Sequence, residues 1–150
     1  MKAASHVELV RAQKAADALA CGIDESRISV LVDRFYSAVR TDDLLGPIFQ
    51  RHVKDWPHHL ARMKDFWMSV IVEPGRFSGN PMQKHIAIGE LGGGHFNRWQ
   101  SLWDQTLMDS APSAEAANRF RQAARRIGES LLTGIEIKRD GLKSISVRTA

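Results

Sequence analysis

Cysteine occurs once in the 150 residues, at Cys21, which excludes an internal disulfide framework and a cysteine-rich zinc site. Long hydrophobic runs are also missing, and no segment approaches the roughly 18 apolar residues of a membrane-spanning helix. Residues 18–21 resemble the end of a bacterial lipoprotein signal, but the preceding segment is too charged for that role. These features predict a cytoplasmic protein in a reducing compartment, with no membrane attachment.

The sequence also lacks the patterns that are typical of β-strands. Apolar and polar residues do not alternate along the chain, whereas apolar residues recur at spacings of three and four, as on one face of a helix. Hydrophobic residues make up 43% and charged residues 25%, which is typical of a globular domain that buries a core. The sequence therefore predicts an all-α protein without internal repeats.

Positive and negative charges nearly balance in the sequence. Lysine and arginine number 21 against 17 acidic residues, and a net charge of +4 is too small to indicate a dedicated nucleic-acid binder. The strongest basic cluster is Arg119, Arg121, Arg125 and Arg126, which on a long amphipathic helix is typical of a solvated face. A helical DNA-binding or interaction module is a remote alternative, and no nucleic-acid partner is expected.

Helix caps, apolar stripes and Gly/Pro breaks divide the chain into predicted elements. Residues 44–50 contain a Gly-Pro pair and are predicted to be a connector that carries Phe49 inward, and residues 73–80 are predicted to be a loop. Helices are predicted over residues 5–20, after the cap Asp24, after the cap Asp55, from Pro81 over a short segment, over about 94–109, and after Pro112 and Ser113.

The sequence argues against two common types of binding site, a zinc site and a phosphate-binding loop. His58 and His59 are adjacent and point to different helix faces, and no HExxH occurs, so the histidines do not have the spacing of a zinc site. The glycines between residues 89 and 94 follow a predicted helix instead of a strand and lack the Lys-Ser/Thr pair of a phosphate loop.

Four residues with polar tips fall on the apolar faces of different helices: Tyr36, His59, His85 and Trp99. Buried hydroxyl and indole groups need hydrogen-bond partners, so their convergence is costly unless a polar group is bound between them. A planar, largely apolar cofactor with a reactive metal centre satisfies that requirement.

The order and spacing of several segments resemble the truncated haemoglobins of the third group. These segments are FYSAVRTDDLLGPIF from Phe35, WPHHLARMKDFW from Trp56, NPMQKH from Asn80 and HFNRWQSLW from His95. The resemblance covers about residues 25–135 and implies a globin-like fold, the truncated two-over-two helical sandwich, for a globin domain at 25–137. Two features depart from the family. One is an extra N-terminal helix at residues 1–24, expected to pack on the domain, and the other is a basic tail at 138–150, whose lack of an apolar pattern predicts disorder.

The resemblance also implies the roles of individual residues. His85 matches the proximal ligand of haem iron, and Tyr36 and Trp99 match the distal donors to the bound ligand. His59 matches the distal histidine, although the doubled His58-His59 leaves two candidates, between which the spacing to Trp67 favours His59. Phe49 is expected to pack on the haem and Arg62 to reach a propionate, and the other expected pocket residues are Phe35, Met63, Phe66 and Trp67.

Because CxxCH is absent, the expected cofactor is non-covalent haem b. The expected function is reversible binding of O2, CO, NO or a similar small ligand at the open iron position, where protein donors set affinity. The alternative is a haem enzyme that detoxifies NO or peroxide with an external reductase, because no flavin or nicotinamide motif occurs in the chain.

Overall fold

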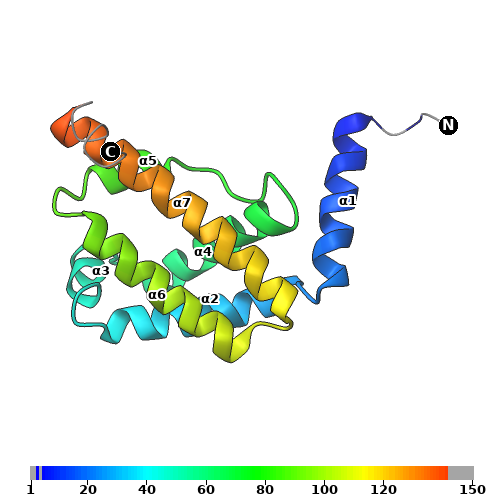
Figure 1. Ribbon diagram of the computed structural model, residues 1–150, viewed down its shortest axis with the longest axis horizontal. Coiled ribbons are helices and arrows are strands. Elements are labelled where there is room, and N and C mark those ends of the chain that lie inside the picture. The colour runs from blue at the N-terminus through cyan, green and yellow to red at the C-terminus, as the bar shows by residue number, and fades with distance from the viewer. Residues whose placement is uncertain (1–2, 4, 142–150) are drawn as a thin grey trace.

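The computed structural model describes residue 3 and residues 5–141. Over these residues it contains only helices, with no strand, which confirms the all-α prediction. None of the described helices is both long and apolar enough to cross a membrane. The helices, shown in Figure 1, are α1 (His6–Ala20), α2 (Glu25–Thr41), α3 (Gly46–His52), α4 (Trp56–Ile71), α5 (Pro81–Ile86), α6 (Gly93–Ser110) and α7 (Ala114–Asp140).

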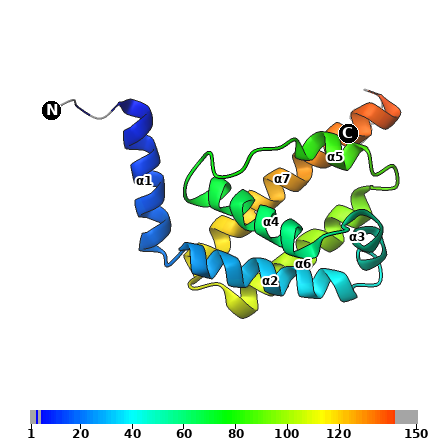
Figure 2. The same cartoon turned by 180° about the vertical axis from the view of Figure 1, so that it is seen from behind.

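Two pairs of helices form the body of the molecule. Helix α2 packs against α4, and α6 packs against α7. Helix α2 also packs against α6 and so joins the pairs, while the short α5 lies on α7, as Figures 1 and 2 show from opposite sides. This two-over-two arrangement places α4 and α5, which carry the candidate histidines, on neighbouring parts of the bundle.

Side-chain caps fix where the main helices begin. The carboxylate of Asp24 accepts a hydrogen bond from the backbone N–H of Arg27, and Asp55 accepts one from His58. At α7 the hydroxyl of Ser113 accepts from Ala116. Each bond satisfies a backbone donor that has no partner in the first turn, so the predicted starts at Asp24, Asp55 and Ser113 are confirmed.

The segment at residues 44–50 is where the structure corrects the sequence prediction of a connector. Residues Gly46–His52 form helix α3, with Pro47 in its first turn, where the missing N–H of proline does no harm. A Cβ atom at Gly46 would lie 2.9 Å from the carbonyl oxygen of Arg40, so glycine is what lets α3 approach the end of α2 this closely. Phe49 is half-buried and packs on the core.

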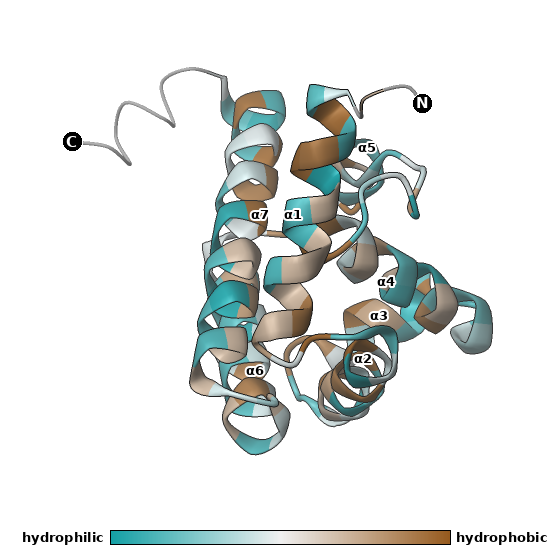
Figure 3. Cartoon of the chain, turned by 90° about the vertical axis from the view of Figure 1, so that its right-hand side faces the viewer, coloured by the Kyte–Doolittle hydropathy of each residue, from teal (hydrophilic) through white to brown (hydrophobic). Residues whose placement is uncertain are grey.

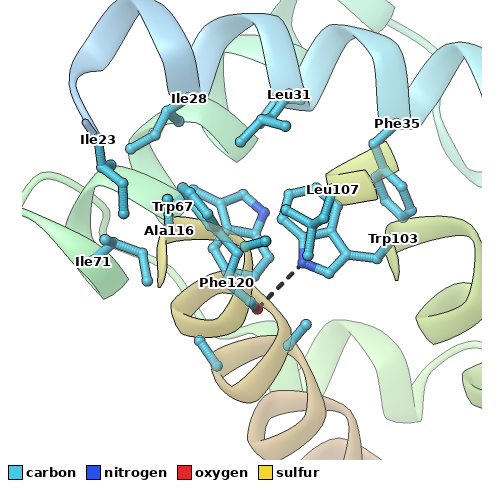
Figure 4. Close-up of a cluster of buried hydrophobic side chains, with 14 of the residues drawn as sticks. Ile23, Ile28, Leu31, Phe35, Trp67, Ile71, Trp103, Leu107, Ala116 and Phe120 are labelled. Carbon is cyan, nitrogen blue, oxygen red and sulfur yellow. Dashed lines mark hydrogen bonds between the residues drawn. The ribbon is translucent and has the colours of Figure 1, made fainter. Parts of the chain in front are cut away.

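The centre of the core lies where α2, α4, α6 and α7 meet (Figure 4). Trp103 is completely buried, and its ring stacks on Trp67 with centroids 4.7 Å apart and an angle of 12° between the planes. Its indole Nε1 donates a hydrogen bond of 3.3 Å to the carbonyl oxygen of Phe120. The buried indole is therefore satisfied within the protein, and Trp103 joins α6 to both α4 and α7.

Helix α1 stands apart from the bundle in Figures 1 and 2. Ser5 and Glu8 form a capping box at its start, but residues 6–13 are exposed and the helix meets the bundle only near its end, where Ala18 is buried. The predicted packing on the domain is thus limited to the last turns. Figure 3 shows apolar residues near the outer end, in agreement with the exposure of Val7, Leu9 and Val10.

The C-terminal helix is longer than predicted. Helix α7 continues to Asp140, so residues 138–140 of the predicted disordered tail are helical, while residues 142–150 lie outside the described residues. The guanidinium of Arg139 donates hydrogen bonds to the carbonyl oxygens of Gly89 and Leu91. The last turn of α7 therefore holds the segment that follows α5.

Candidate functional site

His85 lies on α5, a six-residue helix that Pro81 opens and that the side chain of Asn80 caps. Its Nδ1 atom lies 2.6 Å from the carbonyl oxygen of Pro81, one turn earlier. A carbonyl oxygen only accepts hydrogen bonds, so Nδ1 carries the proton and donates it. In the neutral ring Nε2 then keeps its lone pair, which is the form of histidine that binds a metal.

Partial burial favours this neutral form of His85. Burial lowers the pKa of the imidazole below its ordinary value, and the hydrogen bond to Pro81 opposes that change without cancelling it. The ring is half-buried, on a helix that in the sequence follows the loop 73–80 and precedes the glycine-rich turn before α6. His85 therefore presents an unprotonated Nε2 near neutral pH, with its ring orientation fixed from within its own helix.

Tyr36 is buried on α2 and is surrounded by aromatic rings. The ring centroid of Tyr36 lies 5.1 Å from that of His59 and 5.7 Å from that of Phe49, in edge-to-face arrangements. Burial raises the pKa of the Tyr36 hydroxyl well above its ordinary value, so the group keeps its proton. The hydroxyl is consequently available as a hydrogen-bond donor at any physiological pH.

His59 has a ring nitrogen without a partner. Its Nε2 atom is shielded from water and makes no hydrogen bond to any of the described residues. Burial, together with the smaller effect of positive charge from Arg62, His58 and His85, lowers the pKa of His59 to about 4. The ring is thus neutral and lies within electrostatic range of His85, whereas the adjacent His58 is exposed.

Trp56 is a residue of this site to which the sequence assigned no role. Its ring lies 5.5 Å from His59, 6.0 Å from Tyr36 and, nearly parallel, 6.3 Å from Phe49. Trp56 is half-buried and is the first residue of α4. The contacts of Trp56 with Phe49 and Tyr36 depend on how α3 and α2 pack against the start of α4. Such packing cannot be predicted from a local sequence pattern.

The remaining predicted pocket residues differ in how deeply they are buried. Trp99 on α6 is half-buried, and its ring meets that of Phe35 edge to face at 6.0 Å. Met63 and Phe66 are half-buried and pack on the core from α4. Phe35 and Trp67 are almost fully buried against Trp103, so the structure places both in the central core.

Arg62 turns toward the loop between α4 and α5. Its guanidinium donates a 2.9 Å hydrogen bond to the carbonyl oxygen of Ser78 and lies 4.8 Å from the ring centre of Phe77. It lines an open hollow of about 510 Å³ next to His59. The residues around this hollow are His52, Val53, Lys54, Asp55, His58, His59, Arg62, Ser78, Gly79 and Lys84.

The donor set fits a haem better than a bare metal ion. No cluster of three or more histidine, cysteine or acidic side chains able to hold an ion occurs in the part of the chain that the structure describes. What the structure offers is one imidazole with a free lone pair, an unpartnered imidazole nitrogen and a set of aromatic rings. An iron porphyrin needs one such protein ligand, an apolar surrounding and cationic groups for its carboxylates.

Comparison with known proteins agrees with this arrangement. No family model matches the sequence. The chain is 30% identical over 89 residues to the group 3 truncated haemoglobin ctb of Campylobacter jejuni, an alignment that covers 57% of this chain and 70% of the relative.

The fold is similar to a solved structure from the same organism. The crystal structure of a group III truncated haemoglobin from Campylobacter jejuni superposes with a TM-score of 0.70 at 28% identity, and covers 75% of this chain and 91% of that one. Sequence identity, coverage and fold together show that the chain belongs to the group III truncated haemoglobins.

Proposed function

We propose that the protein binds one haem b non-covalently through His85 and holds a small diatomic ligand, such as O2, CO or NO, on the side of Tyr36, His59 and Trp99. When bound, the haem supplies an iron centre with one position open to such a ligand. The observation that carries the proposal is the hydrogen bond of His85 Nδ1 to Pro81, which leaves Nε2 unprotonated. This bond orients the ring from its own helix, as metal-ligating histidines require.

Charge around the hollow supports the placement of the haem carboxylates. Lys54, Arg62 and Lys84 line it, and Asp55, whose carboxylate caps α4, is the only acidic residue among its lining residues. A carboxylate is stabilised by such cationic donors, and most strongly by the planar guanidinium. To reach a propionate, Arg62 would exchange its hydrogen bond to the Ser78 carbonyl for a charge-assisted one.

Neutral donors support the selection of a polar ligand. The Tyr36 hydroxyl keeps its proton because it is buried, and the indole N–H of Trp99 cannot ionise at ordinary pH. A donor in a water-poor site stabilises a ligand that develops partial negative charge more than it stabilises an apolar one. The two side chains would therefore favour O2 over CO, while the neutral His59 adds a ring nitrogen near Tyr36.

Haemin titration of the purified protein tests the proposal. We expect one equivalent of haemin to bind with a Soret band, and we expect His85→Ala to lose the ferrous spectrum of imidazole-bound haem. His52→Ala is the matched control, because His52 lines the hollow and is exposed. Absence of haemin uptake by the unaltered protein, or an unchanged ferrous spectrum in His85→Ala, would overturn it.

A further inference from the structure

Trp56 is the aromatic residue of the site that the proposed function leaves without a task. It is the first residue of α4, and its ring touches three others that belong to the distal side: Tyr36, Phe49 and His59. Tyr36 is almost fully buried on α2, and Phe49 is half-buried on α3. Trp56 thus joins the start of α4 to both neighbouring helices at the point where His59 lies one turn away.

The ring of Trp56 is held by a cation. The guanidinium carbon of Arg40 lies 4.4 Å from the ring centroid, which is the geometry of a cation–π contact. Arg40 itself is exposed in the last turn of α2, and its carbonyl oxygen is packed against Gly46 at the start of α3. The backbone that carries Arg40 is therefore fixed, and its side chain covers Trp56 from the solvent side of the helix corner.

The inward orientation of the His59 ring requires neighbouring side chains that hold it. Its Nε2 is buried without a hydrogen-bond partner, a state that costs free energy compared with a nitrogen that is hydrated. The residue also borders the open hollow, where a turned-out imidazole would meet water. A half-buried ring next to an open hollow stays inward only if its neighbours block the outward rotamer or fill the space it would leave.

We propose that Trp56, clamped by Arg40, is the positioning residue that keeps the His59 imidazole inward and thereby limits the passage of ligands between the hollow and the distal side. The part that concerns ligand passage rests on the proposed haem function, whereas the orientation of His59 does not. Of the three rings that touch His59, that of Trp56 is the one held by an exposed side chain.

The reactivity of His59 toward diethylpyrocarbonate tests the orientation, since this reagent modifies accessible neutral imidazoles. The full-length protein, with and without haem, is treated and the modified histidines are quantified by mass spectrometry, with the exposed His58 as internal reference. Loss of the cation–π contact in Arg40→Gln should speed modification of His59 by about two- to fivefold, and Trp56→Leu by about tenfold. Arg40→Lys, which keeps the cation, should stay close to the unaltered protein.

Arg34→Gln is the matched control, because Arg34 is an exposed arginine on the same helix that donates to Ser110 instead of covering Trp56. CO association measured by flash photolysis should accelerate in the same order as His59 modification. Unchanged His59 reactivity in Arg40→Gln would overturn the proposal even if Trp56→Leu failed to fold, as would unchanged CO association despite faster modification. Absence of haem uptake would overturn the proposed function instead, and the haem-free measurement would still decide the orientation.

Discussion

The Nδ1 atom of His85 and the carbonyl oxygen of Pro81 lie 2.6 Å apart within one turn of the same helix. The tautomer of the candidate iron ligand is consequently set by its own helix and does not depend on a residue elsewhere in the chain. The orientations of Tyr36, His59 and Trp56 are set differently. These residues come from two helices, and their rings contact one another.

Replacing Trp99 by Phe should speed O2 release by about ten- to a hundredfold, because a hydrogen bond to a charge-separated group is lost. CO release should change much less, since bound CO is less polar. Stopped-flow dissociation of both gases measures the effect. Phe35→Leu is the control, because it removes the ring contact of Trp99 and keeps its N–H. Equal changes for both gases in Trp99→Phe would mean that the residue acts by packing.

The stability of the haem-free protein should fall as the pH drops from about 6.5 toward 4. The folded state lowers the pKa of His59 to about 4, so in this window the unfolded chain binds a proton at this ring that the folded chain does not. The free energy of unfolding therefore rises with pH there, by about 1–2 kcal/mol once solvent screening of the half-buried ring is included.

Urea unfolding at pH 4.5, 5.5 and 7 measures this dependence. His59→Leu should flatten it, while His58→Leu, at the exposed neighbouring position, should leave it in place. His85, whose pKa is also lowered by burial, contributes with the same sign, so a residual slope is expected in His59→Leu. The same slope in His59→Leu and in the unaltered protein would contradict the assignment.

Removal of the Asp42 carboxylate should destabilise the corner between α2 and α3. Its oxygens accept hydrogen bonds from the backbone N–H groups of Leu44 and Leu45 and from Arg98, at 2.9–3.1 Å, and its side chain is 7% exposed. Asp42→Ala leaves these donors without their partner, and we expect a loss of about 2–3 kcal/mol in chemical unfolding. Asp43→Ala, an exposed neighbour, should cost much less, and equal losses would contradict this role.

Two glycine substitutions should have opposite effects. In Gly46→Ala the new methyl group lies 2.9 Å from the Arg40 carbonyl oxygen, so the contact of α3 with α2 must shift, at a cost of about 1–3 kcal/mol. Gly94→Ala, in the first turn of α6 with nothing within 4 Å, should stabilise by about 0.4–1 kcal/mol. Thermal unfolding compares them, and a Gly46→Ala variant as stable as the unaltered protein would show that the corner adapts.

The sequence predicted most of the fold because its signals are local. Asp24, Asp55 and Ser113 cap their helices through bonds that span three residues, so the helix starts can be predicted without knowledge of the tertiary structure. Helix α3 was missed because no side chain caps its start at Leu45, and because a Gly-Pro pair is compatible with the first turn of a helix as well as with a break.

The candidate site could be predicted only in part. His85 and His59 were found through their positions in the apolar pattern and through the family resemblance, and the roles assigned to them stay predictions. Trp56 and Arg40 could not be paired from the sequence, because their contact arises where the end of α2 crosses the start of α4. Arg62 shows the same limit, since its hydrogen bond to Ser78 depends on the path of the loop.

The hydrogen bonds of Arg139 to Gly89 and Leu91 set how far the protein can be shortened from its C-terminal side. A version that ends at residue 141 keeps them, whereas one that ends at residue 137 returns both carbonyl oxygens to water and frees the turn after α5 from α7. The final turn of α7 thus holds the backbone that follows His85, and trimming it would loosen this segment without altering any residue of the candidate site.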